Sequence, residues 1–235
     1  MNYSKTNYII FSKKQSNFTF NIQLEGQKLE QLAETKYLGI ILNEKLSWKK
    51  HVEFITSKLS KASYIISKLR HYIDIDTLKM IYYSLAYPYI SYCITTWGGA
   101  PKTTLKPLVT LQKKIIKLMT FSDMTDPTTP LFSRLKILKF EDIYNLHLAL
   151  LFHKIYNGKI IGSNRLINIQ NIHNYNTRLS TSINFYQSYN ITNLGQTTYT
   201  TAGTKFWRTL PCEIKTKTYS AFKSKVKDIL INNYL

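Results

Sequence analysis

Residues 45–70 read KLSWKKHVEFITSKLSKASYIISKLR, and this stretch decides the fold. Its apolar residues recur with a period of about 3.6, which predicts an amphipathic helix. We expect Ser47 to be the N-cap and Leu69 to lie near the end of this helix. At about 100° per residue, one apolar stripe contains Trp48, Val52, Ile55, Leu59, Ala62, Ile66 and Leu69.

The opposite side of the same helix is basic. Lys50, Lys61 and Lys68 fall within about 20° of one another on a helical projection. The stretch as a whole has six Lys and one Arg against one Glu, a net charge of +6. The pattern therefore predicts a helix that packs through one face and presents lysines on the other.

Positive charge is unevenly distributed along the chain. The 235 residues contain 32 Lys and Arg against 13 Asp and Glu, a formal charge of +19. Residues 1–44 carry +1 and residues 71–100 carry −1, so the surplus of the first hundred residues lies in 45–70. Residues 101–160 add +6 and residues 161–235 add +7. A concentrated excess of this kind predicts an acidic partner, most commonly nucleic acid.

A second explanation of the charge stays open. Most of the basic residues are Lys, and they occur alongside many Ile, Asn and Tyr. AT-rich coding produces this bias without selection for binding, which would leave only a solvated lysine-rich surface.

Residues 1–44 alternate apolar and polar side chains, which predicts short β-strands. One alternation runs from Phe18 to Leu24, and residues 36–42 form a further strand candidate. Gly39 within that candidate indicates a bulge or a close approach of another group to the backbone. We expect these strands to form a small sheet.

Residues 45–160 keep the helical period. Beyond the first helix we expect one capped by Asp76, one entered through Pro107 and one from about Glu141 to Tyr156.

Residues 161–235 are expected to form an irregular C-terminal segment. Residues 166–204, rich in Asn, Thr, Ser and Tyr, predict loops and short strands, and Ser220 is the expected N-cap of a last helix. The fold class is therefore α+β, mainly α-helical, with a small β region, a helical domain and this irregular segment.

No arrangement of residues predicts a catalytic or metal site. Asp74 and Asp76 are two residues apart at a helix start, a spacing that suits capping. Cys93 and Cys212 allow at most one disulfide, and we expect them to be small buried side chains. The spacing of His147 and His153 does not match a helical metal pair, and the other three histidines are scattered.

The chain has no apolar run of the roughly 18 residues that a bilayer requires, and its start is too polar for a secretory signal. We therefore expect an intracellular protein without a membrane partner. Nothing in the sequence distinguishes the nucleus from the cytoplasm or specifies an oligomeric state.

The order of several short motifs is more specific than any one of them. In chain order they are Asn2-x-x-Lys5-Thr6, Lys36-Tyr37-Leu38-Gly39-Ile40, Leu46-Ser47-Trp48 with His51, Tyr82, Tyr92 with Trp97, Leu111-Gln112-Lys113-Lys114, His173-x-x-Asn176-Thr177-Arg178, and Trp207-x-x-Leu210-Pro211 before Phe222. This order resembles the end of the palm, the thumb and the C-terminal region of reverse transcriptases from non-LTR (LINE-type, jockey-like) retrotransposons. Arg208 departs from the family, which usually has Asn after the tryptophan.

The resemblance implies a C-terminal fragment of an RNA-directed DNA polymerase. Residues 1–44 would be a palm-end β remnant, 45–160 a thumb-like helical domain and 161–235 the C-terminal segment. The family holds two metal ions with a palm aspartate and an Asp-Asp pair, and no residue here matches them. We therefore expect no catalytic residue and no cofactor in this chain, although the full-length enzyme would use Mg²⁺, and no activity of the chain alone.

The resemblance also assigns roles to lysines. A polymerase thumb holds a template–primer duplex, either RNA–DNA hybrid or duplex DNA, without reading its sequence. Lys5 would lie near the nucleotide site, and residues 36–39 resemble the region that supports the primer end. The residues expected to contact the duplex backbone are Lys50, Lys61, Lys68, Lys113, Lys114 and Lys117.

Two other functional interpretations stay open at this point. In the first, the chain is a decayed, non-functional retroelement product. In the second, it is a co-opted protein-interaction domain on which the lysine face is incidental.

Overall fold

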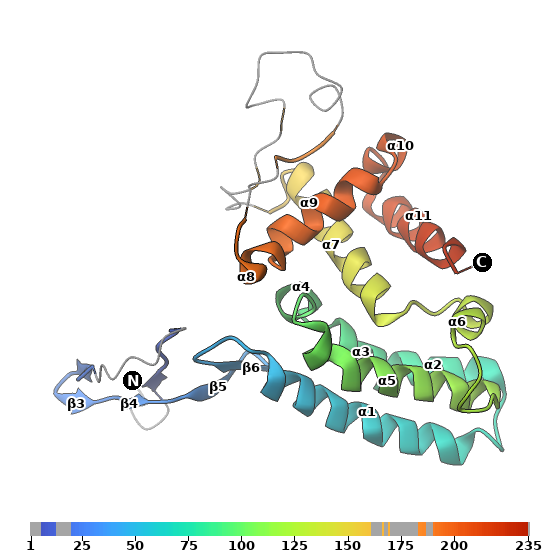
Figure 1. The fold of residues 1–235 in the computed structure, drawn as a ribbon, viewed down its shortest axis with the longest axis horizontal. Helices are drawn as coiled ribbons and strands as arrows, with labels where there is room; N and C mark the ends of the chain where they lie inside the picture. Colours follow the sequence, from blue (N-terminus) through green and yellow to red (C-terminus); the bar gives the residue numbers. More distant parts are fainter. Residues whose placement is uncertain are drawn as a thin grey trace.

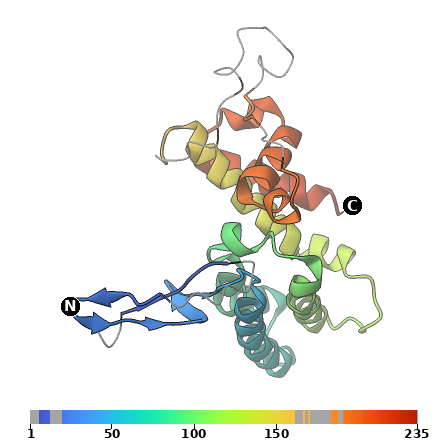
Figure 2. The same cartoon turned by 60° about the vertical axis from the view of Figure 1, so that its left-hand side comes forward.

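The computed structural model describes residues 6–12, 20–160, 166, 169, 183–186 and 190–234. In this part of the chain, short strands come first and helices follow. Figures 1 and 2 show the strands projecting away from a body of helices. The mainly helical α+β class expected from the sequence is confirmed.

The described strands form three separate pairs. In β1 and β4 the pairing is parallel, and in β2–β3 and β5–β6 it is antiparallel. The strands are β1 (Asn7–Tyr8), β2 (Gln23–Leu24), β3 (Gln27–Lys28), β4 (Glu30–Gln31), β5 (Glu34–Tyr37) and β6 (Ile40–Asn43). The expectation of one small sheet is therefore wrong for the described residues.

The exposure of the apolar residues explains why these strands do not form one sheet. Phe20 is 54% exposed and Ile22 is 40% exposed, so the alternation expected to bury one face buries neither of them. Phe18 lies outside the described residues. A strand pair of two residues has no covered face to bury side chains against, and it gains little stability alone.

Residues 36–42 form two strands joined by a tight turn, and not the single strand expected. Tyr37 pairs with Ile40, and Leu38 (φ 45°) and Gly39 (φ 82°) connect them. Positive φ at both central residues is typical of the type I′ turn that joins hairpin strands. A side chain at position 39 would also meet the ring of Tyr92 at 3.3 Å, so the expected close approach at Gly39 is confirmed and the bulge is not.

The first group of helices lies along one side of the molecule (Figure 1). It contains α1 (Lys49–Leu69), α2 (Ile75–Leu85), α3 (Tyr87–Ser91), α4 (Ile94–Trp97) and α5 (Lys102–Thr120). Helix α1 packs against both α5 and α2. Its predicted stripe is buried from Val52 to Ile66, with Trp48 and Leu69 half-buried at the two ends.

A buried amide connects two helices of this group to the segment between α6 and α7, residues 136–139. The Gln112 Nε2 group of α5 donates to the Tyr82 hydroxyl of α2 at 3.0 Å and to the Leu138 carbonyl oxygen at 3.1 Å. Gln112 is 1% exposed, so its hydrogen bonds are shielded from water. Burial also raises the pKa of Tyr82 well above its ordinary value.

Three helix starts differ from the sequence predictions. Helix α1 begins after Trp48, whose φ is 60°, and not after Ser47. Helix α2 is capped by Asp74, whose Oδ2 accepts from the backbone N–H groups of Asp76 and Thr77. Hydrogen bonds from Thr77 hold the pKa of the Asp74 carboxyl below its ordinary value. The last helix starts after Thr218, two residues before Ser220.

Pro107 lies inside α5, which begins five residues earlier at Lys102. The prediction that this helix is entered through Pro107 is therefore wrong. Lys102 follows Pro101, whose extended backbone (ψ 141°) ends the preceding loop. Pro107 stands in the second turn, where it removes one backbone donor.

The second group of helices is built around α7. It contains α6 (Thr129–Leu135), α7 (Phe140–Tyr156), α8 (Asn193–Gln196), α9 (Tyr199–Thr209), α10 (Cys212–Lys215) and α11 (Tyr219–Asn232). Helix α7 contacts α3 and α4 of the first group and also packs against α9 and α11. Its bounds agree with the sequence prediction within one residue.

Trp207 of α9 is the centre of an aromatic cluster in this group. Its ring lies within 6.2 Å of the rings of Phe152, Phe185 and Phe222, measured between centroids. Its Nε1 donates to the Ile183 carbonyl oxygen at 2.9 Å. The cluster explains why α9 forms where loops and short strands were expected: burial of one face outweighs the low helix propensity of its Thr and Gly residues.

Cys93 and Cys212 are both free and exposed. The prediction that they are buried is wrong for both, because each occupies a helix start at the surface. Among the described residues, no helix is long and apolar enough to cross a membrane.

The Gly203→Ala variant tests the contact between α9 and α7. A Cβ at this position would lie 2.2 Å from Cε2 of Phe152, which is fully buried against Trp207 and Phe185 and cannot move aside freely. We expect the variant to lower the free energy of unfolding in urea by about 1–3 kcal/mol. Lys205→Ala, an exposed change in the same helix, is the control, and equal stability of the two variants would contradict this packing.

Candidate nucleic-acid interface

The three lysines predicted on the outer face of α1 lie where expected. Lys50, Lys61 and Lys68 are all exposed, opposite the buried stripe. With a rise of about 1.5 Å per residue, they form a row about 27 Å long. The Lys68 ammonium lies 5.7 Å from the centre of the Tyr64 ring, a cation–π contact at the surface.

Helix α5 supplies a second row, only part of which was predicted. Lys113 and Lys114 are exposed as expected, and Lys102 and Lys106 extend the row toward the start of the helix. Those two lysines were missed because the helix was expected to begin at Pro107.

Lys117 does not belong to this row. It is 7% exposed, and its ammonium group donates to the Met124 carbonyl oxygen in the loop after α5. A lysine held in this way stabilises the loop and is not available to a partner. Periodicity alone could not reveal this, because position 117 lies on the outward side of an isolated helix and only the returning loop covers it.

Helices α1 and α5 run side by side in the same direction (Figure 1). Near their starts, Lys49 and Thr103 line the same groove, and at their far ends the Arg70 guanidinium lies 4.8 Å from the centre of the Phe121 ring. The groove has a volume of about 440 Å³, and Val52 and Pro107 form part of its apolar wall.

The two lysine rows lie on opposite flanks of this groove. Apart from Val52, which lines the groove, the core residues of both helices point to the other side of the pair, toward the interior. We define the lysine surface as the exposed lysines of these two rows: Lys50, Lys61, Lys68, Lys102, Lys106, Lys113 and Lys114.

The charge of the lysine surface is not neutralised within the described chain. Helix α1 has five Lys and one Glu and α5 has five Lys and no acidic residue, so the pair carries nine net positive charges. One ion pair among the described residues joins Lys45 to Glu44, outside both helices. An uncompensated field of this size attracts anionic partners and steers their approach.

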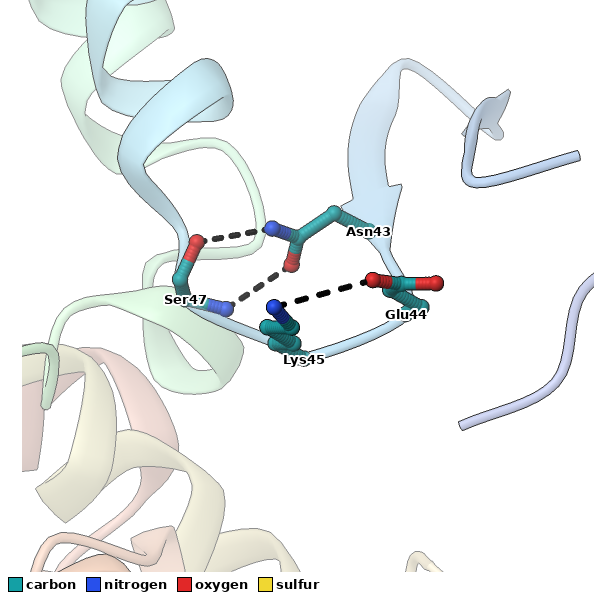
Figure 3. Close-up of polar contacts among 4 residues, drawn as sticks. All are labelled: Asn43, Glu44, Lys45 and Ser47. Atoms are coloured by element: carbon teal, nitrogen blue, oxygen red, sulfur yellow. Dashed lines mark hydrogen bonds and ion pairs between the residues drawn. The ribbon is translucent and has the colours of Figure 1, made fainter. Parts of the chain in front are cut away.

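A polar corner connects β6 to α1 (Figure 3). The Asn43 side-chain amide donates to Ser47 Oγ at 2.7 Å, and the Ser47 backbone N–H donates to Asn43 Oδ1 at 2.8 Å. Ser47 therefore serves this corner instead of capping the helix. The Lys45 ammonium lies 3.9 Å from Glu44 Oε1 beside it, both exposed to solvent.

The tip of the β5–β6 hairpin is fastened to the helices. The Tyr92 hydroxyl donates to the Leu38 carbonyl oxygen at 2.7 Å, and the Trp97 Nε1 donates to the Tyr92 carbonyl oxygen at 3.0 Å. Tyr37 and Leu38 at this tip are 63% and 70% exposed. The hairpin is therefore held in place by α4 and its preceding turn while it presents two large side chains to solvent.

His51 connects the hairpin to α1 and α4. Its ring lies edge-on to Trp97 at 5.3 Å and to Trp48 at 6.4 Å, and its Nδ1 accepts from the Ile41 backbone N–H at 3.4 Å. It is 2% exposed, and burial lowers its pKa. The residues of the Leu46-Ser47-Trp48 and Tyr92–Trp97 motifs thus meet in one structural joint.

Acidic pH should weaken this joint through His51. Because burial lowers its pKa below the ordinary 6.5, the unfolded chain takes up a proton at pH values where the folded chain does not. The stability contributed by neutral His51 is complete above about pH 6.5 and is lost as the pH falls toward the folded-state pKa. We expect the urea-derived free energy of unfolding to fall between about pH 7.5 and 5.5.

In His51→Gln this pH-dependent fall should be smaller, although part of it stays because burial also lowers the pKa of His147. His71→Gln, at an exposed position, should keep the full pH dependence of the parent chain. An identical fall in all three proteins would show that His51 does not couple stability to pH.

Several predicted features fall outside what the structure describes or do not form a site. Lys5 and the His173–Arg178 motif lie outside the described residues. Within the described chain, no group of three or more His, Cys, Asp or Glu side chains could hold a metal ion. These residues therefore do not fit the Mg²⁺ site that the resemblance implies for a full-length enzyme.

Comparison with known proteins gives curated relatives but no matching family model and no matching solved structure. The chain is 25% identical over 150 residues to the RNA-directed DNA polymerase from mobile element jockey of Drosophila funebris, covering 59% of this chain and 16% of the relative. It is 27% identical over 151 residues to the probable RNA-directed DNA polymerase from transposon X-element of Drosophila melanogaster, covering 63% and 16%.

A third relative is the probable RNA-directed DNA polymerase from transposon BS of Drosophila melanogaster, 26% identical over 112 residues and covering 46% of this chain and 12% of the relative. The chain thus spans less than a fifth of the length of each of these relatives. The resemblance drawn from the motifs is confirmed: the chain is related to a region of the RNA-directed DNA polymerases of jockey-like non-LTR retrotransposons.

Proposed function

We propose that the lysine surface binds the backbone of a nucleic-acid duplex, as the template–primer-holding part of a reverse transcriptase. The observation that carries this proposal is the pair of exposed lysine rows on parallel helices, with no carboxylate paired to them in the described chain. The names of the relatives support the class of partner, because an RNA-directed DNA polymerase handles both RNA and DNA.

The chemistry of the surface favours binding that is independent of sequence. Lysine offers a point charge on a flexible stem, which suits contact with phosphates. Base recognition in a groove more often uses the bidentate geometry of Arg, Asn or Gln. Every Lys or Arg position within α1 and α5 is a lysine, and Arg70, directly after α1, is engaged with Phe121. An RNA–DNA hybrid and duplex DNA are both substrates of this kind.

The fastened hairpin has a place in the same proposal. Because the Tyr92 hydroxyl holds the Leu38 carbonyl oxygen, the tip keeps a fixed relation to the helices that carry the lysine surface. The exposed side chains of Tyr37 and Leu38 would then support the end of the primer strand. The proposal covers duplex binding and primer support, and no chemical step is assigned to the described residues.

Charge reversal tests the proposed surface. We expect the triple variant Lys50→Glu, Lys61→Glu, Lys68→Glu to bind an RNA–DNA hybrid more weakly, measured by fluorescence anisotropy over a range of salt concentrations. The slope of log K against log salt should become shallower by about 0.9 for each phosphate that the variant no longer neutralises. A hybrid of scrambled sequence should give the same affinities, because the protein binds the backbone and not the bases.

The matched control reverses three exposed lysines elsewhere, Lys205, Lys217 and Lys225, and so makes the same change in net charge. It should keep most of the parent affinity and salt slope. If the two triple variants weaken binding equally, binding follows net charge alone, and the assignment to the lysine surface is wrong.

A further inference from the structure

A hollow separate from the groove between α1 and α5 lies where the two groups of helices meet. It has a volume of about 390 Å³ and is lined by residues of α3, α4, α7 and α11. None of the lysines of the lysine surface lines it. Its volume falls within the range of about 300–1,000 Å³ that is usual for small-molecule sites.

Three basic side chains converge on this cleft. His147 and Lys154 come from α7, about two turns apart, and Lys223 comes from α11. Burial lowers the pKa of His147, and the positive charges of Lys223 and Lys154 lower it further. Among the described residues, no acidic side chain lines the cleft and neither lysine has an ion-pair partner. The electrostatic environment therefore favours an anion.

The rest of the lining is aromatic and aliphatic. Tyr87 of α3 and Tyr219 of α11 stand on its walls, and Leu146 and Leu150 of α7 line it as well. The Lys154 ammonium lies 5.3 Å from the centre of the Tyr219 ring, so the cationic and aromatic parts of the cleft adjoin. A bare inorganic anion would leave this apolar lining without a partner, whereas an apolar peptide would leave the ammonium groups of Lys154 and Lys223 unpaired.

We propose that this cleft binds a nucleoside monophosphate unit, with the phosphate at His147, Lys154 and Lys223 and the base against Tyr87 and Tyr219. The unit is supplied either as a free nucleotide or as the phosphorylated 5′ end of a single strand. Both present the same chemistry, a phosphate joined through a sugar to a flat aromatic base. Stacking of a base on an aromatic side chain and a charge-assisted phosphate contact are the two interactions that such a site needs.

The test is equilibrium binding to the whole chain, measured by calorimetry with dAMP, adenosine, inorganic phosphate and a 5′-phosphorylated trideoxyadenylate. We expect dAMP or the trinucleotide to bind at least tenfold more tightly than adenosine and than inorganic phosphate. The tighter of the two then identifies the source of the unit. Adenosine or inorganic phosphate binding as tightly as both phosphorylated ligands would overturn the proposal.

Two variants locate the binding. Lys223→Gln and Lys154→Gln should each weaken binding of the tighter ligand by about tenfold, the loss expected for one hydrogen bond to a charged group. Lys225→Gln changes an exposed lysine of the same helix outside the cleft and should leave that binding unchanged. Equal effects of all three substitutions would overturn the assignment to the cleft.

This inference stands independently of the proposed duplex surface. The triple reversal of Lys50, Lys61 and Lys68 should leave nucleotide binding unchanged, because none of these residues lines the cleft. Failure of duplex binding with intact nucleotide binding, or the reverse, would therefore identify which proposal is wrong.

Discussion

The packing of α1 against α5 is the constraint on which the rest of the structure depends. Each helix has one apolar stripe, and the two stripes are buried when the helices lie side by side over α2. Burial of such stripes is the main source of stability for helices of this length. Once the apolar stripes face inward, the lysines on the opposite side of each helix face outward. Two rows of like charge then lie on one surface, where an anionic partner would relieve their mutual repulsion.

Residues that identify the family mostly serve joints in this framework. Tyr92, Trp97 and His51 hold the hairpin against α1 and α4, and Gln112 connects α5 to α2. Trp207 plays the same part between α9 and α7. The motifs therefore fix how the hairpin and the helices sit relative to one another, while the lysines carry the proposed contact. The residues that position the hairpin and the helices are therefore different from the residues that carry the positive charge.

Sequence periodicity predicted the elements that bury a continuous stripe. Helices α1 and α7 agree with their predicted bounds within one or two residues, because an apolar face repeated over four or five turns leaves little choice of conformation. Helix starts were less predictable. Trp48 adopts a left-handed backbone conformation that no N-cap preference predicts. The backbone N–H of Ser47 donates a hydrogen bond to Asn43.

Features that depend on distant parts of the chain could not be predicted. Helix α9 is stabilised by the fit of Gly203 against Phe152, which lies about fifty residues away, and its own residues favour a loop. Lys117 is buried only because the loop to Met124 returns over it. Of the six lysines predicted to contact the duplex, five are exposed. Lys102 and Lys106 were not predicted, because α5 begins five residues before the proline at which the helix was expected to start.

The most direct test of the central claim is a lysine footprint of the complex. The acetylation rate of each lysine would be measured by mass spectrometry with and without a saturating RNA–DNA hybrid. We expect the seven lysines of the lysine surface to become several-fold less reactive, while Lys205, Lys217 and Lys225 keep their reactivity. Equal protection of every lysine, or protection confined to the side of α9 and α11, would contradict this expectation.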